Sequence, residues 1–390
     1  FMIPYGKQEI TQQDIDAVID VLKSDFLTQG PQVPLFEKAI KCAVNAEYAL
    51  AVNSATSALH IACLALGVGR GDLVWTTPIT FVASANCALY CGADVDFVDI
   101  DAETYNLSSE KLEQKLLHAM QNDLPLPKVV IPVHLCGQPC EMDKIHALSI
   151  EYGFAIIEDA SHAIGGRYKG NPIGNCEYSD ITIFSFHPVK IVTTAEGGVA
   201  TTNCVSLAHK IDLLRSHGIT RDEKLMIEPS QGDWYYQQVE LGFNYRMTEM
   251  QAALGVSQMT RLHDFVAKRN ELAERYDDLL KKLPITIPLQ IKDSYSGRHL
   301  YVIRLKLNKL SLSHKEVFDR LRGNGIGVNL HYIPVHTQPY YQKLGFKQGQ
   351  FPIAESYYKD AISIPLFHVM SVEQQDEVVK ALSNILEELQ

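Results

Sequence analysis

Short apolar segments alternate with longer amphipathic stretches between residues 48 and 202 of this chain. The short segments are rich in β-branched residues, as buried strands are, and the longer stretches repeat apolar residues every three or four positions, as amphipathic helices do. This alternation predicts an α/β domain with a large, mostly parallel sheet. We expect its strands at residues 48–52, 73–75, 95–99, 129–133, 154–157, 180–184 and 199–202.

The pattern changes in the second half of the chain. Residues 219–242 are polar and irregular, and we expect them to form an excursion over the surface. Thr248 then precedes a long helical stretch that reaches about Leu283 and ends before a proline. We predict a large domain at residues 1–250 and a smaller α+β domain at residues 251–390, entered through this helix. The smaller domain should contain strands at 300–307 and 328–330 and helices at 315–324 and 372–389.

The composition disfavours several classes of partner. The 390 residues include 35 basic and 46 acidic ones, a net charge of -11, and no long run of lysine or arginine occurs. This balance argues against a nucleic-acid partner. No apolar run approaches the length of a membrane span, and the polar start lacks the apolar core of a signal peptide. We therefore expect a cytoplasmic protein with no membrane partner.

Eight cysteines are scattered along the chain, several of them in apolar surroundings. This usage fits free thiols in a reducing compartment better than it fits a disulfide framework. His134, Cys136 and Cys140 have a spacing that could suggest metal ligands, but no second ligand pair follows at zinc spacing. We therefore expect no metal.

One lysine, Lys190, stands on a turn between the last two predicted strands of the sheet. An isolated lysine is usually a solvated surface residue. Here Ser185 precedes it, a glycine pair at 197–198 follows it, and apolar residues flank the turn. A partly desolvated lysine loses its proton more easily and can act as a Schiff-base nucleophile. Lys190 is therefore the first candidate catalytic residue.

Two further segments lie beyond the carboxyl ends of predicted strands, where α/β sheets bind ligands. Asp159 follows the strand at 154–157, although a helix cap or a turn residue would also explain it. Residues 53–57 open a helix with small hydroxyl side chains, which serve as N-caps but also present N–H groups to an anion. The sequence pattern leaves both alternatives open for each segment.

With these segments in order, the chain resembles the DegT/DnrJ/EryC1/StrS family of PLP-dependent nucleotide-sugar aminotransferases. The resemblance covers essentially the whole chain. It implies the aspartate aminotransferase-like fold, fold type I of the PLP-dependent transferases. The matching segments are residues 53–59, 80–83, 158–163, 185–190, 196–198, 243–247 and 331–336.

The resemblance implies a role for each candidate residue. Lys190 would form a Schiff base with the cofactor, pyridoxal 5′-phosphate (PLP, or PMP in its amino form), and would shuttle protons. Asp159 would pair with the pyridinium nitrogen, which makes the ring an electron sink, and Phe81 would stack on the ring. The cofactor phosphate would be bound by Ala55, Thr56, Ser57 and Ser185.

The remaining candidates are less closely defined by the resemblance. Asn244 matches a residue that reaches the phosphate from the neighbouring subunit, which implies a homodimer with shared active sites. His162 stands where many members of the family carry glutamine, so its contact stays open. Four further histidines are candidates for the substrate side, although each could equally be structural: His187, His217, His331 and His336.

The implied reaction is an amino transfer. L-Glutamate would supply the amino group, and the C4 keto carbon of a UDP-linked 4-keto-6-deoxy-N-acetylhexosamine would receive it, in the pseudaminic acid branch of the family. An alternative branch forms UDP-4-amino-4-deoxy-L-arabinose. Two rival classes are a sugar dehydratase, which replaces the Schiff-base lysine with histidine, and a non-catalytic relative. The intact set of Lys190, Asp159 and Ser185 argues against both.

Overall fold

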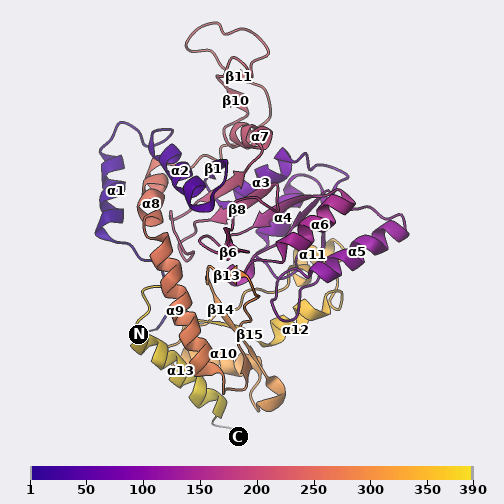
Figure 1. Ribbon diagram of the computed structural model, residues 1–390, viewed down its shortest axis with the longest axis vertical. Helices are drawn as coiled ribbons and strands as arrows, with labels where there is room; N and C mark the ends of the chain where they lie inside the picture. Colours follow the sequence, from indigo (N-terminus) through magenta and orange to yellow (C-terminus); the bar gives the residue numbers. More distant parts are fainter. Residues whose placement is uncertain (1, 388–390) are drawn as a thin grey trace.

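The main sheet has seven strands: β1 (Tyr48–Val52), β2 (Leu73–Thr76), β3 (Asp94–Phe97), β4 (Val129–Ile131), β5 (Ala155–Asp159), β8 (Ile181–Ser185) and β9 (Gly198–Thr202). Figure 1 shows this computed structural model, which describes residues 2–387. The strand order is β1-β9-β8-β5-β4-β2-β3. All neighbours run parallel except β9, which is antiparallel to both β1 and β8. The prediction of a mostly parallel sheet is therefore confirmed.

Helices cover both faces of this sheet, so its strands are buried on both sides. Val129 and Ile131 point to one face, and Val130 between them points to the other, because successive side chains of a strand alternate. The first face is covered by α3 (Ala55–Ala65), α4 (Ala83–Tyr90) and α7 (Val205–Arg215). The second face is covered by α5 (Ser109–Gln121), α6 (Met142–Tyr152) and α2 (Gln32–Val44).

A second, antiparallel sheet forms a separate hydrophobic cluster with helices of the C-terminal part. Ile3 joins this cluster and pairs with Ile326, so the start of the chain lies beside its end region (Figure 1). The strands are β12 (Ile285–Thr286), β14 (Tyr301–Leu305) and β15 (Ala361–Ile364), and the helices are α9 (Leu262–Leu280), α10 (His314–Gly323) and α13 (Val372–Glu387).

The remaining elements are short or lie at the periphery. They are α1 (Gln12–Leu22), α8 (Glu249–Met259), α11 (Pro339–Lys343), α12 (Pro352–Asp360), β6 (Arg167–Tyr168), β7 (Asn171–Pro172), β10 (Ile219–Thr220), β11 (Gln237–Gln238) and β13 (Ser294–Tyr295), with 3-10 turns at Leu135–Gly137, Leu307–Lys309 and Val335–Thr337. The predicted surface excursion at 219–242 is a projecting arm that is partly ordered by the β10–β11 pair (Figure 1).

The long helix predicted after Thr248 is two helices, α8 and α9. At the break, the hydroxyl of Thr260 donates to the carbonyl of Ser257 (2.6 Å), and the guanidinium of Arg261 pairs with Asp14 (2.8 Å). The hydroxyl of Thr260 competes with backbone N–H groups for a carbonyl of the helix. The ion pair ties Arg261 to Asp14, which lies near the start of the chain. The break lets α8 pack on α1 and α2 while α9 runs to the second sheet. The division at 250/251 stays a prediction.

Two other predicted elements differ from the structure. Residues 328–330 contribute only an isolated bridge between Asn329 and Ser363 instead of a strand. The predicted final helix extends to Glu387, and Leu389 lies outside the described residues. None of the helices within residues 2–387 is both long enough and apolar enough to cross a membrane.

Glu249, in the first turn of α8, caps α2 from across the structure. Its buried carboxylate accepts hydrogen bonds from the backbone N–H groups of Gln32 (2.6 Å) and Val33 (3.1 Å). Glu249→Ala leaves both donors without this acceptor, so we expect the free energy of unfolding to fall by about 2 kcal/mol in urea denaturation. Glu271→Ala, on the exposed side of α9, is the matched control. Equal effects of the two substitutions would contradict the capping role.

Candidate active site

Lys190 lies on the turn that joins β8 to β9. Its backbone N–H donates to the carbonyl of His187 (2.9 Å), and its side chain is half-buried. Burial lowers the pKa of the Lys190 amine to about 8, although the nearby carboxylate of Asp159 and the thiol of Cys136 act in the opposite direction. The structure therefore brings Lys190 and Asp159 together, and a substantial fraction of this amine is neutral near pH 8.

Asp159 ends β5, and hydroxyl groups hold both of its carboxylate oxygens. Oδ1 accepts from the hydroxyl (2.6 Å) and the backbone N–H (3.1 Å) of Ser161, and Oδ2 accepts from the hydroxyl of Ser84 (2.7 Å). Thr80 donates in turn to Ser84 (2.7 Å). Ser84 was not among the candidates predicted from the sequence, because Asp159 lies 75 positions away along the chain. These contacts fix the carboxylate in one position.

The predicted phosphate-binding residues gather around Gly198. In the register of the sheet, Gly198 lies opposite Val52 on one side and Ser185 on the other, so the start of α3 and the end of β8 flank it. A Cβ on Gly198 would lie 2.6 Å from the nitrogen of Ala55. The first turn of α3 begins at Ala55, where backbone N–H groups have no acceptor within the helix and favour an anion.

A cap orders this first turn of α3. The hydroxyl of Ser54 accepts from the N–H of Ser57 (3.1 Å), and the hydroxyl of Ser57 donates to Asn53 (2.6 Å). The N-cap alternative from the sequence is thus true of Ser54, while the N–H groups of Ala55 and Thr56 precede the capped position. Capping and anion binding are therefore compatible here, because they use different donors.

His162 contacts Tyr332, which was not among the candidates predicted from the sequence. Nδ1 of His162 accepts from the backbone N–H of Cys136 (3.1 Å), so Nε2 carries the proton and donates to the hydroxyl of Tyr332 (3.1 Å). Burial, together with the charge of Lys190, lowers the pKa of His162 well below its usual value. Phe81 is 59% exposed, with its ring centroid 6.3 Å from that of Tyr332. Phe81, Tyr332 and His162 therefore form a continuous aromatic wall.

Two more histidines lie close enough to Lys190 to respond to its charge. His331 hydrogen-bonds Ser363 through Nδ1 (2.7 Å), and burial with the Lys190 charge lowers its pKa to about 3. The ring of His299 lies 4.4 Å from that of His162, and its pKa is also lowered well below the usual value by burial. Within residues 2–387, Nδ1 of His299 has no hydrogen-bond partner. All three imidazoles are therefore neutral at physiological pH.

The other predicted residues lie in three different places. His187 is exposed on the Lys190 turn. His217 and Asn244 are exposed at the base of the arm, where Asn244 bridges to Ser216. His336 is fully buried, with Nε2 2.9 Å from Glu355. The structural alternative therefore describes His336, whereas the surface position of Asn244 leaves it free to face another chain.

His134, Cys136 and Cys140, which have a spacing that could suggest metal ligands, make other contacts. His134 hydrogen-bonds Glu158 through Nε2 (2.6 Å) and accepts from the backbone N–H of Cys140 through Nδ1 (3.0 Å). Cys136 instead lies close enough to Lys190 for the lysine charge to act on the pKa of its thiol. In the described part of the chain, no group of three or more His, Cys, Asp or Glu side chains is arranged to hold a metal ion.

Comparison with known proteins shows relatives along the full chain. The sequence model of the DegT/DnrJ/EryC1/StrS aminotransferase family matches residues 8–383. The UDP-4-amino-4,6-dideoxy-N-acetyl-beta-L-altrosamine transaminase of Campylobacter jejuni is 39% identical over 389 residues, 100% of this chain and 98% of that protein. The spore coat polysaccharide biosynthesis protein SpsC of Bacillus subtilis is 39% identical over 387 residues, 98% of this chain and 97% of that protein.

Solved structures show the same fold. PseC of Helicobacter pylori, an aminotransferase involved in the biosynthesis of pseudoaminic acid, superimposes with a TM-score of 0.90 at 30% identity and covers 100% of both chains. The PLP form of the sugar aminotransferase Spr1654 of Streptococcus pneumoniae gives a TM-score of 0.88 at 29% identity, over 100% of this chain and 99% of that one. The expected fold type I of PLP-dependent transferases is confirmed.

The residues in the site fit PLP. Gly198 lets β9 pass close to the start of α3, where the first backbone N–H groups of the helix suit a phosphate. The half-buried amine of Lys190 and the fixed carboxylate of Asp159 lie near each other, as an aldehyde-bearing pyridine requires. The chain thus belongs to the DegT/DnrJ/EryC1/StrS aminotransferase family, and its cofactor is pyridoxal 5′-phosphate.

Proposed function

We propose that the protein transfers the amino group of L-glutamate to the C4 keto carbon of a UDP-linked 4-keto-6-deoxy-N-acetylhexosamine. The product would be UDP-4-amino-4,6-dideoxy-N-acetyl-β-L-altrosamine, as for the Campylobacter relative that this chain matches along its whole length. The observation that carries the proposal is the proximity of a half-buried Lys190 to a carboxylate fixed at the end of β5. PLP, when bound, supplies the electron sink for amino transfer.

Lys190 serves as the base and acid of the reaction. A proton-transfer group works best when its pKa lies near the working pH, because both protonation states are then populated. Burial brings the pKa of Lys190 to about 8, which meets this condition. His162 and His331 are neutral, so neither imidazole places a second positive charge beside Lys190.

Asp159 orients the cofactor ring. Its two oxygens are already occupied by donors from Ser84 and Ser161, so the carboxylate does not rotate when a ligand binds. Because the carboxylate is already held in place, little reorganisation free energy is needed when it pairs with a protonated ring nitrogen. The aromatic wall of Phe81 and Tyr332 borders the same space and would contact the ring face.

The second candidate function is amino transfer to another nucleotide sugar, such as the UDP-4-keto-pentose that gives UDP-4-amino-4-deoxy-L-arabinose. The Bacillus protein of spore coat polysaccharide biosynthesis is as similar to this chain as the Campylobacter transaminase, which supports this wider class of substrate as the second candidate. A non-catalytic role is less compatible with the intact Lys190 and Asp159.

A panel of 4-keto UDP- and dTDP-sugars with L-glutamate tests the proposal, with products identified by mass spectrometry and NMR. We expect amination at C4 of the UDP-linked 4-keto-6-deoxy-N-acetylhexosamine. Lys190→Ala should abolish turnover without loss of the circular dichroism spectrum, and Lys315→Ala, which removes an exposed lysine on α10, is the matched control. Faster amination of another sugar would overturn the substrate, and a fully active Lys190→Ala variant would overturn the mechanism.

The lowered pKa of Lys190 predicts a pH profile that can be measured on the free chain. Below about pH 8 the amine is protonated and unreactive, and above it the amine is free. Labelling of Lys190 by an amine reagent, mapped by mass spectrometry, should therefore rise through pH 8. Exposed Lys315 should respond at a clearly higher pH, because its ion pair with Asp319 raises the pKa of its amine. Asp159→Asn removes a carboxylate that favours the ammonium, so the midpoint should move lower. A midpoint for Lys190 near that of Lys315 would contradict its burial.

We further propose that two chains share each active site, as the resemblance implies for Asn244. The arm beside Asn244 carries large apolar side chains that its own chain leaves in solvent, including Ile227 (82% exposed) and Trp234 (73% exposed). Exposed apolar surface of this kind marks an interaction site. A two-fold dimer that covers the arm would place Asn244 of each chain toward its partner.

Mixed dimers test this arrangement. Asn244→Ala and Lys190→Ala chains should be weak or inactive alone. A heterodimer of the two has one site damaged twice and one intact site, so mixing should restore up to half of the activity per dimer. Subunit exchange is checked independently by mass spectrometry. Confirmed exchange without recovery of activity would show that the site is built within one chain.

A further inference from the structure

A pocket of about 540 Å³ lies beside the start of α4, outside the residues that fit the cofactor. Its volume falls in the range of small-molecule sites. The lining is mostly apolar and aromatic, with two amide side chains and no charged side chain. The lining residues are Val82, Asn86, Leu89, Tyr90, Gln338, Pro339, Tyr340 and Tyr341.

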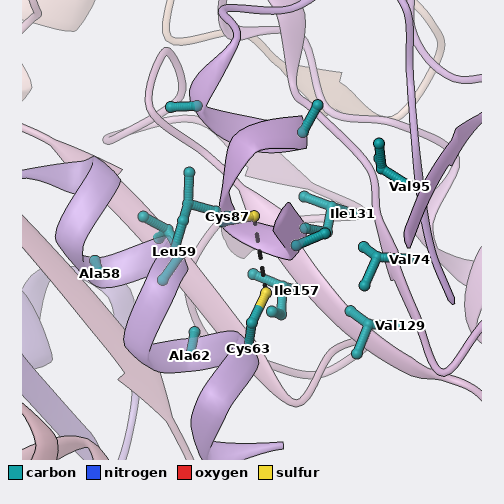
Figure 2. Close-up of a cluster of buried hydrophobic side chains, with 14 of the residues drawn as sticks. Ala58, Leu59, Ala62, Cys63, Val74, Cys87, Val95, Val129, Ile131 and Ile157 are labelled. Carbon is teal, nitrogen blue, oxygen red and sulfur yellow. Dashed lines mark hydrogen bonds between the residues drawn. The ribbon is translucent and has the colours of Figure 1, made fainter. Parts of the chain in front are cut away.

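Another face of α4 is packed in the core, which fixes this wall of the pocket. The sulfur of Cys87 on α4 lies 3.7 Å from that of Cys63 on α3, within a cluster of apolar side chains that Figure 2 shows. Both cysteines are fully buried. Val82, Asn86 and Leu89 are three and four positions apart, so they share a different, partly exposed face of the helix. α4 therefore presents a fixed row of side chains to the pocket.

Two segments of the chain lead from the aromatic wall of the active site to this pocket. Phe81 of the wall is followed directly by Val82 of the pocket. Tyr332 of the wall begins the segment that supplies the other side of the pocket. The backbone N–H of Val335 in this segment donates to the carbonyl of Pro78 (2.9 Å), which ties the two segments together. The pocket therefore lies beside the space that Phe81 and Tyr332 border.

The two amides of the pocket have hydrogen-bonding groups to spare. Oδ1 of Asn86 accepts from the hydroxyl of Tyr341 (2.6 Å), which orients this amide and leaves its NH2 group as a donor. Gln338 precedes α11 and makes no capping hydrogen bond with its side chain. Its amide is therefore available both to donate and to accept.

Tyrosine rings supply the flat surfaces of the pocket. Tyr340 is 60% exposed and Tyr90 is 54% exposed, although both line the pocket. The ring of Tyr340 lies 5.8 Å from that of buried Tyr341 in an edge-to-face arrangement, so its own face stays open. Proteins bind single nucleotide bases by stacking them on exposed aromatic rings and by hydrogen-bonding their edges.

We propose that this pocket binds the uracil base of the nucleotide sugar, an inference that rests on the proposed function. Uracil has a flat face for a tyrosine ring, and its edge has one N–H donor between two carbonyl acceptors. The NH2 group of Asn86 matches one carbonyl, and the amide of Gln338 matches the N–H and the other carbonyl. None of the lining residues is acidic, which fits a ligand that carries a diphosphate.

Titration of the full chain with UMP, followed by saturation-transfer NMR of the nucleotide, tests the proposal. We expect the strongest transfer at the ring protons of uracil. UMP methylated at N3 should bind more weakly, because the methyl group removes the donor that Gln338 accepts. No binding of UMP, or equal affinity for the two nucleotides, would overturn the proposal. The measurement needs no keto sugar and no glutamate, so it reports on the pocket separately from the proposed amino transfer.

Two substitutions locate the nucleotide in the pocket. Tyr340→Ala removes the exposed ring, and we expect the affinity for UMP to fall about tenfold, the order that loss of one stacking partner produces. Gln338→Leu removes the amide at similar size and should abolish the discrimination between UMP and its N3-methyl form. Tyr358→Ala, on the exposed side of α12, is the matched control.

Unchanged affinity for UMP in the Tyr340→Ala protein would overturn the proposal. A shift of its dimer–monomer equilibrium with unchanged affinity would also overturn it, because a second chain would then cover the pocket. If the UDP-linked keto sugar is not aminated but UMP binding still depends on Tyr340 and Gln338, the proposed reaction fails and the base site stands. If the sugar is aminated with the same KM in the Tyr340→Ala protein, the base site fails and the reaction stands.

Discussion

A close approach of two backbones at Gly198 sets the geometry of the site. A side chain there would lie 2.5 Å from the carbonyl carbon of Ser54 and 2.6 Å from the nitrogen of Ala55, so only glycine lets β9 pass this close to α3. Because β9 is antiparallel to both neighbours, its first residue lies between the last residues of β1 and β8. The first turn of α3, whose N–H groups favour an anion, and the turn that carries Lys190 therefore both start next to Gly198.

The charge of Lys190 is controlled by few groups. Burial alone would push its pKa lower than about 8, and two neighbours act against burial. One of them, Cys136, has its own pKa raised to about 12 by burial, so it is a neutral thiol at physiological pH. Asp159 is thus the anion that keeps the ammonium form available. The three neutral histidines around Lys190 add no positive charge, which is consistent with their depth in the structure.

The sequence could predict the sheet, because strand period and turn glycines are local signals. The order of the motifs also made Lys190 and Asp159 the first candidates for the site. The sequence could not predict that Ser84 binds Asp159, since the two residues are 75 positions apart and nothing in the local pattern around Ser84 indicates a partner. Nor could it separate His331 from His336. They are five residues apart, yet the charge of Lys190 lowers the pKa of His331, whereas His336 hydrogen-bonds Glu355 in the core. Only the tertiary path of the segment decides which way each ring points.

Two opposite hydrogen bonds require the ring of His162 to stay neutral. Nδ1 of His162 accepts from the N–H of Cys136, and Nε2 donates to the hydroxyl of Tyr332. A neutral imidazole has one acceptor and one donor nitrogen, which matches this pair of contacts. A protonated ring would turn an N–H at Nδ1 against the N–H of Cys136. Burial next to Lys190 lowers the pKa of His162 and so maintains the neutral state on which both contacts depend.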